Sequence, residues 1–215
     1  MLTLAEKVDP KHCLLMVVDV QNDFCHAEGS MSRAGQDLAM VDEMMPQLLR
    51  LLEEARRVGA PVIFTQAVHS PWTDSQAWST RLHGLDLELP RHCREGSWGA
   101  ELYELTPRDD ERALAKRRFS AFYGTDLDVM LRALGTRALI MTGVSTNVCV
   151  ETTARDGFMR DYHVVLMSDC CAAYDRAEHQ ATLTNISKYF GQVAGSSEVL
   201  GVWKGLPSAV KKSLK

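Results

Sequence analysis

The sequence predicts an α/β fold in which a doubly wound, mostly parallel sheet is flanked by helices. Short runs of branched apolar residues, typical of strands buried on both faces, alternate with longer segments whose apolar residues recur at helical spacing. This alternation is the pattern of βαβ units. The chain has 215 residues, 46% hydrophobic and 24% charged, with no internal repeat or long linker. We therefore expect one domain over residues 1–215.

Short apolar runs predict the strands. Most of them contain Val, Ile, Leu and Met with no polar face, as parallel strands in the centre of a sheet do. The expected strands cover 14–18, 61–65, 112–116, 138–141 and 163–167.

Three helices follow from the longer periodic segments. Residues 36–58 carry apolar residues on one face, and Gly59 supplies the expected end. Residues 126–134 form a shorter helix, and residues 176–190 a later one. The first helix is expected to bury Leu38, Val41, Met45, Leu48, Leu52 and Ala55, and the last one Ala177, Ala181, Leu183, Ile186 and Tyr189.

Asp19 ends the first apolar run. A carboxylate inside such a run is costly unless it is paired or used. The alternative, a turn-forming or helix-capping role, suits Asp23 better, because Asp19 still belongs to the hydrophobic stretch. Asp19 is therefore a candidate functional residue at the carboxyl end of a buried strand.

Cys149 follows a predicted strand and a turn at Gly143, and lies in the first turn of the next helix. Unpaired N–H groups at a helix start carry partial positive charge, which predicts a thiol pKa lowered toward neutrality. The alternative for a single cysteine is a buried, unreactive side chain.

Lys116 ends a third strand, and its alternative role is a solvated surface cation. The carboxyl ends of parallel strands share one edge of the sheet, where ligands bind. We therefore expect Asp19, Lys116 and Cys149 to meet there as proton carrier, cation and nucleophile.

The segments around these residues resemble the isochorismatase-like cysteine hydrolases, a family that includes nicotinamidases, N-carbamoylsarcosine amidases, biuret hydrolases and ureidoacrylate amidohydrolases. The similar motifs occur in the family's order and are DVQNDF at 19–24, KRRFSAF at 116–122 and TGVSTNVCVETTARDGF at 142–158. The resemblance implies a three-layer fold with a six-stranded sheet and an Asp–Lys–Cys triad. It also implies a cis peptide between Val144 and Ser145 that aims backbone N–H groups near Cys149 at an oxyanion.

The implied activity is cysteine-dependent hydrolysis of a C–N bond in a small carbamoyl, ureido or primary amide substrate, through a thioester intermediate. Two other enzymatic activities of the family, a nicotinamidase-like amidase and an isochorismatase-type hydrolase, are alternatives, although the latter does not use a cysteine nucleophile. A further alternative is a catalytically silent binding protein on the same scaffold. The family usually forms homodimers or homotetramers.

We expect neither a metal nor a cofactor. Nicotinamidase-like members hold a divalent ion with an Asp-x-His pair after the second strand and a further His. Here the corresponding carboxylate position is Ala67, which leaves His69, with His83 as the nearest candidate partner. Two imidazoles make a poor zinc site, so His69 is either a substrate-binding or a structural residue.

A long polar segment, 69–98, is the candidate lid over the cleft. The other histidines, His92 among them, are expected to be structural or exposed. Four aromatic residues are candidate walls of the substrate pocket: Phe24, Trp72, Phe122 and Tyr123.

Composition restricts the partners. The net charge is −4 and the isoelectric point about 6.0, which argues against nucleic acid. No apolar stretch reaches the roughly 20 residues of a membrane span, and no signal peptide is evident. Six scattered cysteines without a C-x-x-C pair fit the reducing cytoplasm.

Overall fold

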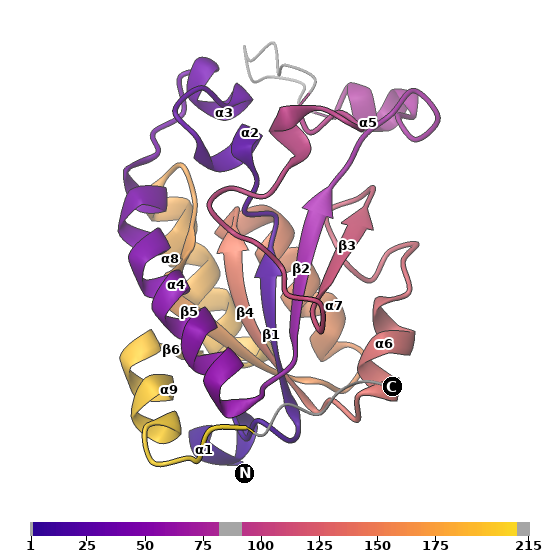
Figure 1. The fold of residues 1–215 in the computed structure, drawn as a ribbon. Helices are drawn as coiled ribbons and strands as arrows, with labels where there is room; N and C mark the ends of the chain where they lie inside the picture. The colour runs from indigo at the N-terminus through magenta and orange to yellow at the C-terminus, as the bar shows by residue number, and fades with distance from the viewer. Residues whose placement is uncertain (1, 82–91, 210–215) are drawn as a thin grey trace.

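Six parallel strands form one sheet, with the order β3-β2-β1-β4-β5-β6 (Figure 1). The computed structural model describes residues 2–81 and 92–209. The prediction of a six-stranded α/β fold is confirmed. The strands are β1 (Cys13–Val18), β2 (Val62–Ala67), β3 (Arg112–Lys116), β4 (Ala138–Val144), β5 (His163–Ala172) and β6 (Gln192–Ala194).

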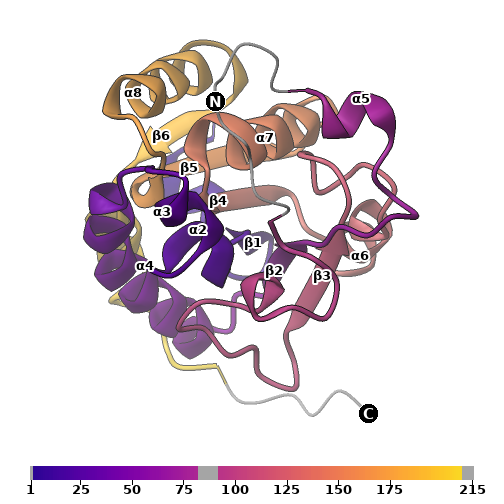
Figure 2. The ribbon, with the colours of Figure 1, turned by 90° about the horizontal axis from the view of Figure 1, so that it is seen from above.

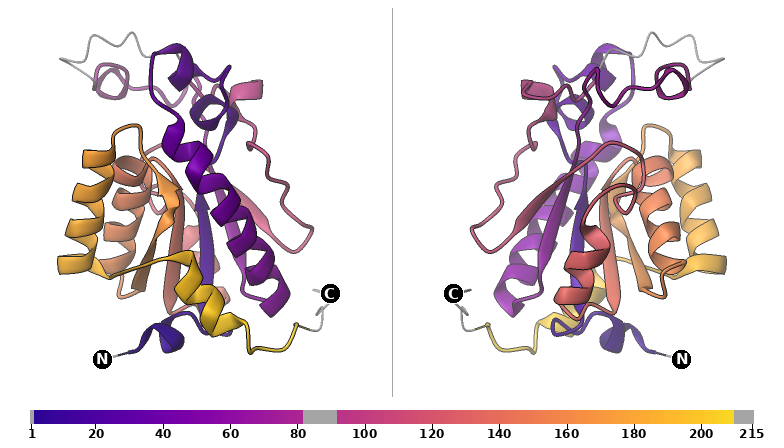
Figure 3. Two further views of the ribbon diagram at one scale, coloured as in Figure 1. Left: turned by 90° about the vertical axis from the view of Figure 1, so that its left-hand side faces the viewer. Right: turned by 90° about the vertical axis from the view of Figure 1, so that its right-hand side faces the viewer.

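Helices cover both faces of the sheet, which gives three layers (Figure 3). On one face α4 (Ala39–Val58) and α9 (Ser196–Trp203) pack together, and on the other lie α6 (Leu127–Ala133), α7 (Glu151–Phe158) and α8 (Arg176–Asn185). Within the described ranges no helix is long and apolar enough to cross a membrane. The short helices are α1 (Leu4–Lys7), α2 (Asn22–Cys25), α3 (Ser30–Arg33) and α5 (Gln76–Ser79), with the single turns η1 (Trp98–Ala100), η2 (Thr146–Val150) and η3 (Ile186–Phe190).

Burial explains the composition of the strands. Every residue of β1 and β4 is buried, because helices cover both faces of these central strands. The edge strand β3 buries only Leu114 and Lys116. Several strands continue beyond their predicted ends, β4 to Val144 and β5 to Ala172. Thr142 still pairs with Val17 of β1, and Cys171 and Ala172 pair with Gly143 and Val144 after a shift in register. The short strand β6 carries no apolar run that would have predicted it.

Helix α4 agrees with the prediction on its buried face but begins three residues later than expected, at Ala39. Gly59 ends it in the left-handed region, with φ 77°. Leu38, at the N-cap, is only half-buried. The other five predicted core residues are buried, together with Met44, Leu51 and Val58.

The predicted inner face of the helix over 176–190 is confirmed at Ile186, which is buried in η3, and at Leu183, which is half-buried against the core, but it is wrong at the other three positions. Ala177, Ala181 and Tyr189 are exposed, and the buried residues of the helix are His179 and Thr182. The reason is that α8 contacts its neighbours through hydrogen bonds. His179 bonds Thr146 at 2.9 Å and Thr182 donates to Glu151 at 2.6 Å.

The carboxyl ends of β1, β2, β3 and β4 all face the same side of the molecule, under α2, α3 and α5 (Figures 1 and 2). At this edge β4 passes very close to β1. A Cβ atom on Gly143, which has φ +105°, would lie 2.1 Å from Val18 O and 2.6 Å from Val18 N. Only glycine permits this approach.

Replacing this glycine should therefore destabilise the protein more than replacing an unobstructed one. We expect Gly143→Ala to lower the free energy of unfolding by at least about 3 kcal/mol, because strand backbones must separate. Gly135→Ala is the matched control: its φ is +66° but a Cβ there meets nothing within 4 Å, so about 1–2 kcal/mol is expected. Urea unfolding followed by circular dichroism measures both. Equal losses would contradict the steric argument.

Candidate active site

Asp19 directly follows β1 and is fully buried, with φ 51° in the left-handed region. Thr65 of β2 donates to Asp19 Oδ1 at 2.7 Å, and the Asp19 N–H donates to Thr65 O at 3.1 Å. A non-glycine residue in this backbone region carries about 1 kcal/mol or more of strain, which neighbouring contacts must hold in place. These contacts turn the carboxylate toward the edge of the sheet.

Lys116, the last residue of β3, is 1% exposed. Its Nζ lies 2.7 Å from Asp19 Oδ2 and 3.3 Å from Cys149 Sγ, and it donates to Arg118 O at 3.0 Å. Burial lowers the pKa of Lys116, but its interaction with the charged carboxylate of Asp19 opposes this, and the pKa is raised above its ordinary value. The ammonium group therefore stays protonated and is the shared neighbour of the acid and the thiol.

Cys149 lies in η2, a π-helical turn that leads into α7, and is 8% exposed. The N–H groups of Val148 and Val150 donate to Ser145 O at 3.1 and 3.2 Å. The peptide bond between Val144 and Ser145 is cis. Thr153 donates to Cys149 O at 2.7 Å, so the turn is held on both sides of the sulfur.

The expectation of a lowered thiol pKa is wrong for this structure. Burial raises the pKa of Cys149, the charge of Lys116 lowers it and the charge of Asp19 raises it, which together bring it to about 12. The prediction considered only the helix start, whereas desolvation and the adjacent carboxylate come from distant segments. The thiol is therefore protonated at rest, with Lys116 Nζ 3.3 Å from the sulfur.

A cavity of about 480 Å³ opens at this edge of the sheet, within the range of small-molecule sites. Lys116 and Cys149 line it, as do Val144 and Ser145 beside the cis peptide. Phe24 also lines the cavity, and Tyr174 Oη donates to Phe24 O at 3.0 Å. The structure thus brings the ion pair, the sulfur and the predicted oxyanion segment to one crevice.

Three predicted wall residues do not line this cavity. Trp72 is 97% exposed and Tyr123 is 66% exposed. Phe122 is buried in the core, where its ring stacks on Tyr162 at 6.1 Å. Trp78 and Phe119 line the cavity instead, with ring centroids 4.8 Å apart. Both belong to segments that the sequence singles out, but residue type alone does not reveal which aromatic ring faces the crevice.

His69 lines the cavity and is 4% exposed. Its Nδ1 lies 3.8 Å from Asp74 Oδ1, and its ring centroid 5.5 Å from that of His92, which also lines the cavity rather than the surface. Burial lowers the pKa of His69 to about 4, so the imidazole is neutral at neutral pH. Residues 2–81 and 92–209 contain no group of three side chains arranged to hold a metal ion; His83 lies outside these ranges.

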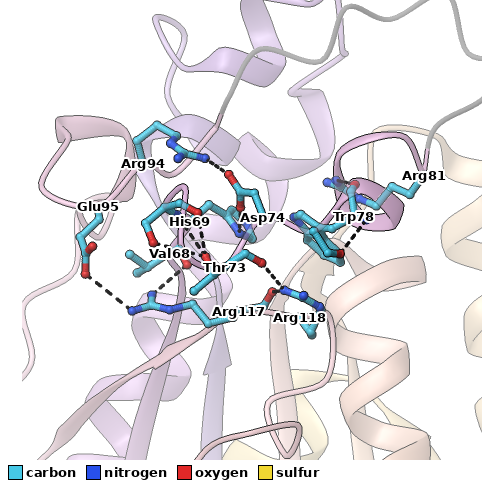
Figure 4. A network of polar contacts seen from close by, with 12 residues as sticks. Val68, His69, Thr73, Asp74, Trp78, Arg81, Arg94, Glu95, Arg117 and Arg118 are labelled. Atoms are coloured by element: carbon cyan, nitrogen blue, oxygen red, sulfur yellow. Dashed lines mark hydrogen bonds and ion pairs between the residues drawn. The ribbon is translucent and has the colours of Figure 1, made fainter.

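Two arms of segment 69–98 are described, 69–81 and 92–98, and they are joined to each other (Figure 4). His69 N–H donates to Cys93 O at 2.9 Å, and Glu95 N–H donates to His69 O at 3.0 Å. Arg94 pairs with Asp74. Asp23, expected in a turn or cap, accepts the N–H groups of Ser30 and Cys93 at 3.0 and 2.6 Å. These contacts hold both arms over the carboxyl edge.

Comparison with known proteins agrees with this geometry. The family model described as the Isochorismatase domain matches residues 13–198. The chain is 35% identical to the ureidoacrylate amidohydrolase RutB of Methylobacterium radiotolerans, and the alignment covers 94% of this chain and 84% of that protein.

Solved structures share the fold. A cysteine hydrolase from Pseudomonas syringae pv. phaseolicola 1448A has a TM-score of 0.80 at 29% identity, with 92% of this chain and 95% of that chain covered. N-carbamoylsarcosine amidase from Thermoplasma acidophilum has a TM-score of 0.62 at 28% identity, covering 86% of this chain and 96% of the other. Because the family model matches most of its length, and the fold and the crevice agree with that match, the chain belongs to the isochorismatase family.

Proposed function

We propose that this protein is a cysteine amidohydrolase that cleaves a C–N bond of a small carbamoyl or ureido substrate. The observation that carries the proposal is the buried contact chain from Asp19 Oδ2 to Lys116 Nζ at 2.7 Å and on to Cys149 Sγ at 3.3 Å. Similarity to a ureidoacrylate amidohydrolase and to an N-carbamoylsarcosine amidase supports this substrate class.

In this mechanism Cys149 is the nucleophile and Asp19 the proton carrier. As Sγ attacks the carbonyl carbon, the thiol proton passes to Asp19. Backbone N–H groups of Cys149 and its neighbours, next to Val144 and Ser145, stabilise the oxyanion. Asp19 then gives the proton to the departing nitrogen, the C–N bond breaks, and an acyl thioester remains on the sulfur.

In the hydrolysis of the thioester, Asp19 is again the base and the sulfur is the leaving group. Asp19 takes a proton from a water molecule, whose oxygen attacks the thioester carbon, and the C–S bond breaks. The proton returns to the sulfur, so the thiol and Asp19 regain their starting states. Lys116 remains protonated throughout, because it pairs with Asp19 and lies next to the sulfur, where negative charge develops during the attack.

We also propose His69 and Phe24 as substrate contacts, because both line the cavity. The neutral imidazole of His69 has a buried Nδ1 without a hydrogen-bond partner in the described ranges. No metal is needed in this mechanism, since Asp19 moves the protons.

We further propose a single-domain, homodimeric or homotetrameric enzyme of the cytoplasm. Exposed apolar side chains at Phe158, Met159 and Tyr189 offer a surface for a second copy, and all six cysteines are free thiols. Light scattering on the purified protein measures the oligomeric state, and a monomer would contradict this part of the proposal.

Removal of the sulfur should abolish turnover. We expect Cys149→Ala to lower kcat/KM on a panel of ureides and primary amides by at least about a thousandfold, measured as ammonia release. Cys170→Ala is the matched control, because Cys170 is also buried but lies outside the cavity. Unchanged turnover in Cys149→Ala would exclude the thiol mechanism. Silence of the wild type across the panel would favour a binding role.

The pH dependence of alkylation tests the electrostatics. The pKa of Cys149 is raised, so the thiolate fraction at pH 8 is smaller than for a free thiol, and iodoacetamide labelling should keep accelerating above pH 9. Asp19 raises that pKa and Lys116 lowers it. Asp19→Asn should therefore speed labelling at pH 8 while turnover is lost, and Lys116→Met should slow it.

Mass spectrometry of the labelled peptide identifies the site, with Cys149→Ala as the blank. A wild-type titration midpoint near neutrality would contradict the assigned direction of the pKa.

A further inference from the structure

The hydroxyl group of Thr65 binds Asp19 at two points. The register of the sheet pairs Thr65 of β2 with Val18, the last residue of β1, which places it next to the residue that follows. The Asp19 N–H donates to Thr65 Oγ1 at 3.2 Å, and this hydroxyl donates to Asp19 Oδ1 at 2.7 Å. A single hydroxyl group therefore contacts both the backbone and the carboxylate of Asp19.

The direction of the contact with the carboxylate follows from the chemistry of the two groups. An ionised carboxylate only accepts hydrogen bonds, and a threonine hydroxyl has one proton to donate. The proton of the Thr65 hydroxyl therefore points to Oδ1. Threonine has few χ1 rotamers, and Thr65 is fully buried. The carboxylate of Asp19 is thus held in one orientation.

The two carboxylate oxygens of Asp19 have different surroundings. Oδ1 accepts from Thr65, whereas Oδ2 lies 2.7 Å from Lys116 Nζ. Apart from this ion pair, the buried Oδ2 has no hydrogen-bond partner among residues 2–81 and 92–209. The same ammonium group lies 3.3 Å from Cys149 Sγ. Oδ2 therefore shares a neighbour with the sulfur and has an unused acceptor position.

We propose that Oδ2 of Asp19 is the atom that carries the proton, and that Thr65 is the positioning residue that gives Oδ2 this role. The inference rests on the proposed function. The proton leaves Sγ for Oδ2 as the bond from sulfur to the carbonyl carbon forms. It then passes from Oδ2 to the departing nitrogen as the C–N bond breaks. Oδ1 keeps its hydrogen bond to Thr65 in both steps, so the carboxyl group does not turn between them.

The test is the pH dependence of turnover in Thr65→Val, which keeps the shape of the side chain without the hydroxyl. Loss of a donor disfavours an ionised carboxylate, so we expect the acid limb of kcat/KM to move up by roughly one to two pH units. We expect kcat at the optimum to fall about 10- to 100-fold and KM to stay within about twofold. Thr65→Ser restores the hydroxyl and should return the acid limb close to that of the wild type.

Thr142→Val is the matched control. Thr142 is an equally buried threonine of the neighbouring strand β4, and its hydroxyl donates to Met16 O at 2.8 Å. The acid limb of this variant should coincide with that of the wild type. An equal shift in Thr65→Val and Thr142→Val would indicate a general effect of removing a buried hydroxyl, and would overturn the proposal.

Two further kinetic results would overturn the proposal. One is an unshifted acid limb in folded Thr65→Val. The other is a kcat above that of the wild type, which would assign the proton to Oδ1, because the substitution frees that oxygen. Circular dichroism establishes that each variant is folded, and Thr65→Ala, which also lacks the hydroxyl, replaces Thr65→Val if the latter is not.

A measurement without substrate separates this inference from the proposed function. NMR titration of isotope-labelled aspartate side chains follows the protonation of Asp19, with Asp19→Asn to identify its signal. A titration midpoint that is higher in Thr65→Val than in the wild type would support the positioning role in a protein that hydrolyses none of the ureides and amides. Coincident titration curves would overturn that role whatever the activity.

Discussion

The buried ion pair between Lys116 and Asp19 is the interaction on which the rest of the site depends. Neither side chain is more than 1% exposed, and either charge alone would be strongly unfavourable at such a depth. The 2.7 Å contact, together with hydrogen bonds to Thr65 and Arg118 O, compensates the loss of water. The two charges act in opposite directions on the pKa of the neighbouring thiol, and burial of the sulfur is the largest cause of its raised pKa.

The sheet order explains how this pair forms. Strand β2 lies between β1 and β3, so Asp19 and Lys116 approach each other across the end of β2, and Thr65 of that strand holds the carboxylate. Gly143 lets β4 approach β1 from the other side and leads the chain into the η2 turn that carries the sulfur. Four neighbouring strands therefore contribute to one crevice although their residues are far apart in sequence.

Much of this arrangement was predictable from the sequence. Apolar runs that end in Asp19 and Lys116, and a strand–turn–helix pattern before Cys149, place all three residues at one edge, because parallel strands end on the same side. The direction in which the thiol pKa is shifted was not predictable, since it depends on burial and on a carboxylate from another segment. The aromatic walls were not predictable either, because Trp72 and Trp78 differ only in how the lid is folded. The inward positions His179 and Thr182 of α8 were missed because their contacts are polar.

That polar face of α8 has a consequence for how the crevice tolerates change. His179, Glu178 and Thr182 bond Thr146, Asn147 and Glu151 in and just after the cysteine-bearing turn. Hydrogen bonds are directional, so α8 fixes the position of this turn more strictly than apolar packing would. The lid arms contribute their cavity-lining side chains without taking part in that network. Variation in the lid can therefore alter what the crevice accepts while the reacting groups stay aligned, a division of labour that suits a scaffold reused for different small molecules.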